Sequence, residues 1–241
     1  MMQKLHILKT PEELADQFAD ELMNQIANFS GKTFHLAISG GKTPDLLFSV
    51  LTKKYSDSEL WQKVHFWWVD ERMVPVTDPE SNFGNALKLL FSQISIPEEN
   101  IHRIKGENDP ETEALSYSAQ IQQNLKLKNG WPVFDLIVLG MGDDGHTASI
   151  FPNQMELFRS KQICAVATHP ESGQKRVTLT GKTINNASKV SFLVTGANKA
   201  NRLSEIWAHQ EKANLLPTAY IHPVSENLEW FLDESAAQFI R

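Results

Sequence analysis

The stretch that decides the fold is TFHLAISGGKTPDLLFSVLTKKY, residues 33–55. Its first part, 33–39, is an apolar run typical of a buried β-strand. Gly40 and Gly41 end this strand, and a helix is predicted over 44–55, with a proline in its first turn where the missing N–H removes no helical hydrogen bond. A buried strand that leads directly into a helix indicates an α/β sheet.

The rest of the chain repeats this alternation. The predicted strands are 64–70, 134–140, 163–168, 176–180 and 189–196, and the predicted helices are 11–28, 82–91, 110–127 and 198–209. Continuous apolar runs such as FDLIVLG are typical of parallel strands covered on both faces. The order predicts a single domain over residues 1–241, with an α/β fold: a Rossmann-like, mainly parallel sheet flanked by helices on both faces.

Composition excludes several classes of protein. A formal net charge of -6 opposes binding to nucleic acid or to an anionic membrane surface. The single cysteine, Cys164, excludes an intramolecular disulfide and is expected to be a buried hydrophobe. No run approaches the roughly 20 apolar residues of a membrane span, and the N-terminus lacks the apolar core of a signal peptide. We therefore expect a soluble, cytoplasmic protein.

Chemistry is expected at one edge of the sheet. In open parallel sheets, ligands bind beyond the carboxyl ends of the strands. Segments rich in glycine or charge follow the predicted strands at 39–43, 70–72, 140–146 and 196–199.

The first segment looks like the tail of a nucleotide-binding P-loop. That motif requires a glycine five residues before the glycine of its Gly-Lys-Thr, and Leu36 occupies the position, which excludes the motif. A glycine backbone and a helix N-terminus remain, and these favour an anion such as phosphate. The candidate binding residues are Ser39, Gly40, Gly41, Lys42 and Thr43. A tight turn without ligand is the alternative, and the side chain of Lys42 is expected to face solvent.

Cations follow two other strands. Arg72 could bind a phosphate through both arms of its guanidinium, and Asp70 could orient a hydroxyl or a base. Lys199 is predicted in the first turn of a helix, where a cation opposes the helix dipole unless an anionic ligand is present. Arg176, at the start of a strand, is a weaker candidate. The alternative for residues 70–72 is a cluster of ion pairs at the rim of the site. The alternative for Lys199 is a solvated lysine without a ligand.

The segment GMGDDGHTASIFP, residues 140–152, carries the candidate catalytic group. An imidazole can be neutral near pH 7, as a general base requires, so His146 is the predicted base and Asp144 could hold its tautomer. Gly142 and Gly145 suggest a backbone shaped around a ligand. The alternative is a loop histidine that caps a backbone carbonyl.

Three neighbouring expectations are negative. The other histidines show no metal-ligand spacing, so no metal site is expected. Ser149 lacks the G-x-S-x-G setting of a nucleophile. Asp143 is expected to be a solvated loop carboxylate.

Five segments together resemble the 6-phosphogluconolactonase family, which shares a superfamily with glucosamine-6-phosphate deaminases and isomerases. They are LAISGGKTPDLLF, VHFWWVDERMVPVTDPESNFG, FDLIVLGMGDDGHTASIFP, RVTLT and FLVTGANKA, and they occur in the order of the family. The resemblance implies hydrolysis of 6-phospho-D-glucono-1,5-lactone to 6-phosphogluconate, in the oxidative pentose phosphate pathway, without metal or organic cofactor.

The resemblance also implies roles for individual residues. His146 matches the base that activates water, while the SGGKTP loop, Arg72 and Lys199 match elements that bind phosphate. Arg176 matches an arginine of the family's R-[IV]-T-L-T segment. Asp70 and Asp144 match acidic positions shared across the superfamily.

Two other functions stay open. Deaminases of the superfamily resemble DGHIAFNEP, with a carboxylate shortly after the histidine, whereas this chain has DGHTASIFP, with Ile150 and Phe151 there. The other alternative is a sugar-phosphate-binding regulator without catalysis. The presence of His146 favours the two enzyme functions over it. The expected partner is a phosphorylated sugar lactone, with no nucleic acid and no membrane, bound by a monomer or small homo-oligomer.

Overall fold

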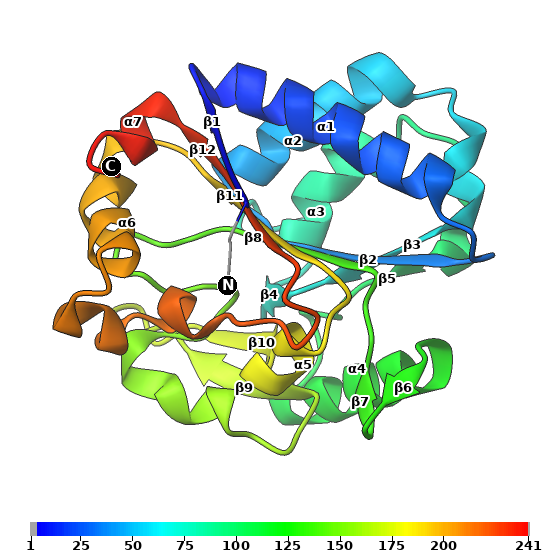
Figure 1. Cartoon of the computed structure of the whole chain (residues 1–241). Helices are drawn as coiled ribbons and strands as arrows, with labels where there is room; N and C mark the ends of the chain where they lie inside the picture. The colour runs from blue at the N-terminus through cyan, green and yellow to red at the C-terminus, as the bar shows by residue number, and fades with distance from the viewer. Residues whose placement is uncertain (1–3, 241) are drawn as a thin grey trace.

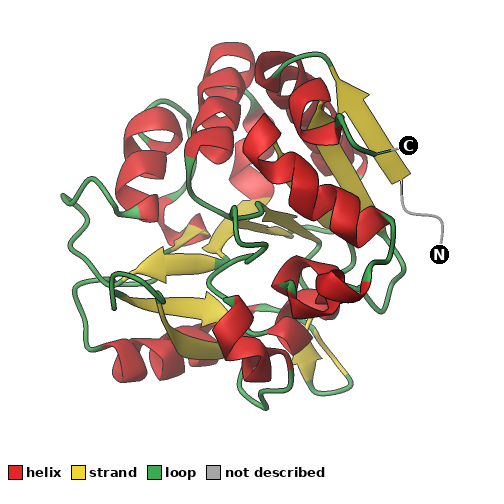
Figure 2. Ribbon diagram, turned by 90° about the vertical axis from the view of Figure 1, so that its left-hand side faces the viewer, coloured by secondary structure: helices red, strands yellow, loops and turns green. Residues whose placement is uncertain are grey.

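A seven-stranded parallel β-sheet forms the centre of the structure, a computed structural model that describes residues 4–240. Its strands, in spatial order, are β1 (Lys4–Leu8), β12 (Leu228–Asp233), β11 (Val190–Val194), β8 (Leu136–Leu139), β2 (Phe34–Ile38), β3 (Val64–Trp68) and β5 (Ile101–His102). Helices lie on both sides of the strands (Figure 2), which confirms the predicted α/β fold class. Residues 1–3 and Arg241, the ends of the predicted domain, lie outside the described residues.

A second sheet is antiparallel and corrects part of the prediction. It consists of β4 (Asp70–Arg72), β10 (Lys175–Leu179) and β9 (Cys164–Thr168). The predicted strands 163–168 and 176–180 therefore do not belong to the parallel sheet, because the connection between them is too short for a parallel crossover. The predicted strand 64–70 also divides: β3 ends at Trp68, and Asp70 begins β4 of the second sheet. A small hairpin joins β6 (Leu127–Lys128) to β7 (Trp131–Pro132).

The helices are α1 (Pro11–Asn28), α2 (Lys42–Tyr55), α3 (Asn82–Ala86), α4 (Pro110–Asn124), α5 (Gly181–Asn185), α6 (Ala200–Trp207) and α7 (Glu234–Ala237). Five of them agree closely with the predicted ranges, whereas the short helices α5 and α7 were not predicted. The α3 helix continues as a π-helical turn over Leu87–Phe91. Figure 1 shows α1, α2 and α3 over one face of the central sheet, and α4, α5 and the antiparallel sheet over the other. No helix among residues 4–240 combines the length and apolar character that crossing a membrane requires.

Apolar side chains of the helices and strands meet in one continuous core. An apolar stripe on α1 is buried, with Leu14 and Ile26 fully covered. Trp67 and Trp68 are also core residues. Cys164 is buried, as expected. Burial raises the pKa of the Cys164 thiol to about 12, so the thiolate that a nucleophile requires is strongly disfavoured.

Three histidines on neighbouring strands form a cluster beside Trp67. Nδ1 of His65 lies 2.8 Å from Nε2 of His102, and the indole N–H of Trp67 donates to Nδ1 of His35 at 3.2 Å. Burial, reinforced by the charge of His65, lowers the pKa of His35 to about 4 and the pKa of His102, with His35 also contributing, to about 3. Burial also lowers the pKa of His65, against the charge of Glu99. Folding therefore favours the neutral form of all three imidazoles.

We expect the free energy of unfolding to fall as the pH decreases from about 6.5 toward about 4. In this window the unfolded chain binds protons on these histidines more readily than the folded chain does, because folding lowers their pKa values. Urea unfolding at about pH 7 and about pH 5 should give a smaller pH-dependent loss for His35→Asn than for the wild type. The exposed His222, replaced by glutamine, is the control and should leave the loss unchanged. An equal loss in wild type and His35→Asn would contradict this account.

Candidate active site

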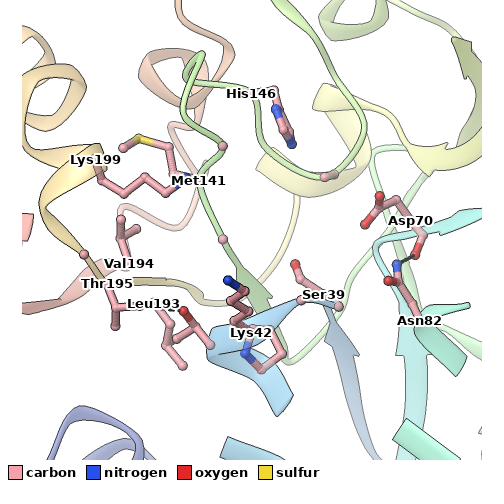
Figure 3. Close-up of a pocket in the computed structure, with 18 of the residues that line it drawn as sticks. Ser39, Lys42, Asp70, Asn82, Met141, His146, Leu193, Val194, Thr195 and Lys199 are labelled. Atoms are coloured by element: carbon pink, nitrogen blue, oxygen red, sulfur yellow. Dashed lines mark hydrogen bonds between the residues drawn. The ribbon is translucent and has the colours of Figure 1, made fainter. Parts of the chain in front are cut away.

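A cavity of about 540 Å³ lies beyond the carboxyl ends of the central strands, where the sequence predicted it (Figure 3). All but two of the predicted site residues line it: Ser39, Gly40, Gly41, Lys42, Thr43, Asp70, Arg72, Gly142, His146, Arg176 and Lys199. Asp144 and Gly145 do not line the cavity, although they directly precede His146 in its loop. The four segments that follow predicted strands thus converge on one hollow, since parallel strands share a carboxyl edge.

The loop after β2 presents the start of α2 to the cavity. Gly41 has a φ of 106°, a conformation that favours glycine, and it occupies the N-cap position. Among residues 4–240, no side chain caps this helix, so the N–H groups of its first turn are available to an anion. The Ser39 hydroxyl is already committed, because it donates to the Val138 carbonyl at 2.9 Å. Backbone amides are therefore the principal donors here.

The side chain of Lys42 is exposed, as expected, but it also lines the cavity. Figure 3 shows it reaching into the hollow. The Lys42 ammonium consequently adds positive charge at the mouth of the cavity, beside the N-terminus of α2.

Two arginines lie directly opposite each other on neighbouring strands of the antiparallel sheet. Arg72 on β4 is the direct register partner of Arg176 on β10. Like charges directly opposite each other in a sheet are destabilising. Burial lowers the pKa of the Arg176 guanidinium; the charge of Asp70 opposes this shift, and the charge of Arg72 adds to it. An anionic ligand that both guanidinium groups contacted from the cavity would offset this local cost.

The residues of the DER segment point in different directions, as strand geometry predicts. Asp70 and Arg72 line the cavity, whereas the buried Glu71 carboxylate accepts the backbone N–H groups of Asn82 and Phe83, each at 2.8 Å. Glu71 thus fixes the start of α3.

The Asp70 carboxylate is held by a contact that the sequence did not reveal. The Ser149 hydroxyl donates to Oδ2 of Asp70 at 2.5 Å, and one N–H group of Arg176 lies 3.5 Å from the same hydroxyl. Ser149 is fully buried, which agrees with the expectation that it is not a nucleophile. Asp70 keeps its second oxygen for the cavity and can accept a hydrogen bond from a ligand hydroxyl there.

His146 projects into the hollow from the loop after β8 (Figure 3). Its Nδ1 lies 2.6 Å from Oδ1 of Asp144, which also accepts the backbone N–H of His146 at 3.0 Å. Burial raises the pKa of Asp144, but the hydrogen bonds and charge of His146 outweigh burial and lower it to about 2. An ionised Asp144 places the ring proton on Nδ1, so Nε2 can act as a base.

Glycines shape the loop around the imidazole. A Cβ atom at Gly142 would lie 2.2 Å from the His146 ring, so only glycine fits there without displacing the ring. Gly145 has a φ of 83°, and a Cβ there would meet Leu216 at 2.8 Å. The carbonyl of Gly145 accepts a hydrogen bond from the Thr218 hydroxyl at 2.8 Å. The segment that contains Leu216 and Thr218 therefore packs against this loop at Gly145, and no sequence motif pointed to it.

Lys199 ends a short 3₁₀ turn, Ala197–Lys199, directly before α6. Its ammonium lines the cavity and also forms an ion pair with Asp143. Asn198 donates to the same Asp143 oxygen at 2.8 Å. The expectation that Asp143 is only a solvated carboxylate is therefore wrong: its hydrogen bond with Lys199 lowers the pKa of Asp143, although burial opposes the shift.

Sequence reasoning did not single out several other residues of the cavity wall, among them Asn82, Met141, Thr195 and Asn198. Asn82 and Asn198 lie within the segments ESNFG and TGANKA, which belong to the family resemblance. Their position in these segments was the sequence signal that could have identified them as site residues. Asn82 donates to the Asp70 carbonyl at 2.9 Å, and its Oδ1 lies so close to Gly40 that a Cβ there would approach within 2.0 Å. It joins the loop after β2 to β4.

One group of possible metal ligands occurs in the described part of the chain. His6, Glu21 and Glu229 bring their ligand atoms within 4.8 Å of one another, outside the cavity. Lys4 and Lys189 pair with the two carboxylate oxygens of Glu229, at 3.0 and 2.7 Å. A cation at this place would have to displace one of these lysines.

The chain is similar to proteins of known name and structure. The family model described as glucosamine-6-phosphate isomerases/6-phosphogluconolactonase matches residues 9–230. A 6-phosphogluconolactonase from Haemophilus influenzae is 43% identical over 232 residues, which cover 96% of this chain and 97% of the relative. A crystal structure of the devB protein is 42% identical, with a TM-score of 0.93 and full coverage, 100%, of both chains. The 6-phosphogluconolactonase from Trypanosoma cruzi is 27% identical, with a TM-score of 0.89 and coverage of 99% and 97%.

Proposed function

This chain belongs to the family of glucosamine-6-phosphate isomerases and 6-phosphogluconolactonases, and from that premise we propose that His146 is the general base of its reaction. The protein is an enzyme of the 6-phosphogluconolactonase type. It hydrolyses 6-phospho-D-glucono-1,5-lactone to 6-phospho-D-gluconate, in the oxidative pentose phosphate pathway. The observation that supports the role of His146 is the 2.6 Å contact between its Nδ1 and Asp144, which frees Nε2 to take a proton.

The proposed mechanism is direct attack by water. Nε2 of His146 removes a proton from water as the water oxygen adds to the lactone carbonyl. The tetrahedral intermediate then collapses, the bond from the carbonyl carbon to the ring oxygen breaks, and the imidazolium returns its proton to that oxygen. Asp144 stabilises the imidazolium while it carries this proton, and it fixes the ring orientation. Asp70 is proposed to hold a sugar hydroxyl through its free carboxylate oxygen.

The phosphate is proposed to anchor the substrate away from the reacting carbon. The N-terminal amides of α2 supply its backbone donors, and Arg72, Arg176 and Lys199 supply its cations. Because the phosphate is remote from the carbonyl, its binding energy can position the lactone against His146. No covalent nucleophile is needed, since a lactone is already an activated ester.

The structure gives no support to the deaminase alternative. Ile150 and Phe151 occupy the positions where a carboxylate would follow the histidine, and both are fully buried. The Phe151 ring packs beside the His146 ring, with the two ring centres 4.8 Å apart. Because these two side chains are apolar, the residues that follow His146 supply no acid for the ring opening of an amino sugar.

We expect freshly made 6-phosphogluconolactone to be hydrolysed far faster than the spontaneous blank, and glucosamine 6-phosphate to release no ammonia. Both assays should use the same enzyme preparation, with His146→Ala as the inactive control for the lactone. Ammonia release at a rate comparable to lactone hydrolysis would contradict the assigned chemistry. Phosphate binding without turnover of either substrate would instead favour a sugar-phosphate-binding regulator.

The cellular setting is proposed from composition. An acidic chain with a single, buried cysteine suits the cytoplasm, where thiols stay reduced, and it disfavours nucleic acid as a partner. We propose that the enzyme acts there as a monomer or small homo-oligomer.

A further inference from the structure

We propose that Asp143 competes with the substrate phosphate for Lys199 and thereby sets the affinity and selectivity of the site for phosphorylated ligands. This inference rests on the proposed role of Lys199 as a phosphate ligand. It concerns a residue that lies outside the cavity lining and does not touch His146, which is bound to the neighbouring Asp144.

The geometry places one cation between two possible anions. Lys199 lines the cavity, yet its ammonium pairs with the Asp143 carboxylate. Asn198, which also lines the cavity, donates to the same oxygen of Asp143 at 2.8 Å. Two donors from the turn after β11 are thus committed to a carboxylate from the loop after β8. A phosphate can recruit Lys199 only by drawing it away from Asp143 or by sharing it.

The solvent exposure of the two side chains determines how strongly Asp143 competes with phosphate for Lys199. The Lys199 side chain is 16% exposed, whereas the Asp143 side chain is 68% exposed. Ion pairs with such an exposed partner contribute little, because water solvates the released carboxylate well. A dianionic phosphate that already meets Arg72, Arg176 and the start of α2 can therefore displace Asp143 from Lys199. A ligand without a phosphate leaves the pair closed.

The pair consequently favours phosphorylated ligands over uncharged ones. In its absence Lys199 would be available to any ligand in the cavity, and phosphate would bind more tightly because no competing anion has to leave. The same reasoning applies to the phosphorylated product, which Asp143 would help to release.

Replacing Asp143 by asparagine tests the competition, since the amide keeps the size of the side chain and removes its charge. We expect Asp143→Asn to bind inorganic phosphate about two- to fivefold more tightly in calorimetry, and to lower the KM for the phosphorylated lactone similarly, which is the range for an exposed ion pair. Glu107→Gln is the matched control, because Glu107 forms an exposed ion pair with Arg103 outside the cavity. It should leave both values unchanged.

The same Asp143→Asn change made in a Lys199→Met variant distinguishes competition for Lys199 from a general gain of positive potential in the cavity. In Lys199→Met, the Asp143→Asn change should no longer tighten phosphate binding, because the contested cation is absent. Equal tightening with and without Lys199 would overturn the proposal, and so would unchanged or weaker phosphate binding in Asp143→Asn. Failure of the proposed catalytic role would look different: lactone turnover would match the blank while the calorimetric effect on phosphate persisted.

Discussion

Replacing His146 by alanine should lower kcat by at least about 100-fold, the scale on which a general base contributes. The imidazole is the group that Asp144 orients toward the cavity with Nε2 free, and Phe151 and Gly142 shape the space around its ring. Alanine removes the proton acceptor without removing any proposed phosphate ligand. The affinity for inorganic phosphate should therefore stay within about twofold of wild type.

The measurement is a stopped assay corrected for spontaneous hydrolysis, combined with calorimetry of phosphate binding. His222→Ala is the control, since this exposed histidine lies outside the cavity lining. A His146→Ala enzyme that retained kcat within tenfold of wild type would remove the assigned base. Loss of phosphate binding together with kcat would instead point to collapse of the loop.

The location of the site could be predicted because it depends on local signals. The strand, the glycines and the helix over 33–55 obey short-range rules, and parallel strands bring their carboxyl ends to a common edge. The α1 helix, Pro11–Asn28, was predicted with the bounds it has, since Thr10 caps it and an apolar stripe runs along it. Local pattern also predicted that Arg72, His146 and Lys199 face one cavity.

Contacts between distant segments could not be predicted. Ser149 and Asp70 are 79 positions apart. They meet because the Ser149 N–H donates to the hydroxyl of Thr178, the residue of β10 that pairs with Asp70 of β4. The opposition of Arg72 and Arg176 has the same origin, because it depends on the register between these two strands. A single sequence reports which segments form strands but not which strands become neighbours.

Three strands of the central sheet, β1, β5 and β12, were missed for a different reason. Strand β12, Leu228–Asp233, contains two acidic residues, which weaken the signal of a buried strand. The structure accommodates Glu229 by pairing it with Lys4 and Lys189. Strands β1 and β5 are short and lie at the two edges of the sheet, so their few apolar residues did not stand out.

Replacing Arg72 by alanine should raise the KM for the phosphorylated lactone by about 10- to 100-fold, with a smaller effect on kcat. A charge-assisted hydrogen bond to phosphate is worth about 1.5–3 kcal/mol, and the proposed guanidinium contact is of this kind. Arg72→Lys should recover only part of the affinity, because an ammonium cannot form the two parallel hydrogen bonds of a guanidinium. The same changes should have little effect on hydrolysis of a glucono-lactone that lacks the phosphate.

The expected stability separates a binding role from a structural one. Arg72 stands directly opposite Arg176, and in the free protein its guanidinium donates to the Glu80 carbonyl at 2.6 Å. Removing one of two opposed cations relieves their repulsion, so Arg72→Ala should unfold at a temperature no lower than wild type. Arg159→Ala, an exposed arginine outside the cavity lining, is the control and should leave KM unchanged. An unchanged KM in Arg72→Ala, together with a lower unfolding temperature, would show that Arg72 has a structural role instead. A higher KM at equal or greater stability means that the opposed pair of Arg72 and Arg176 is maintained because it binds the ligand.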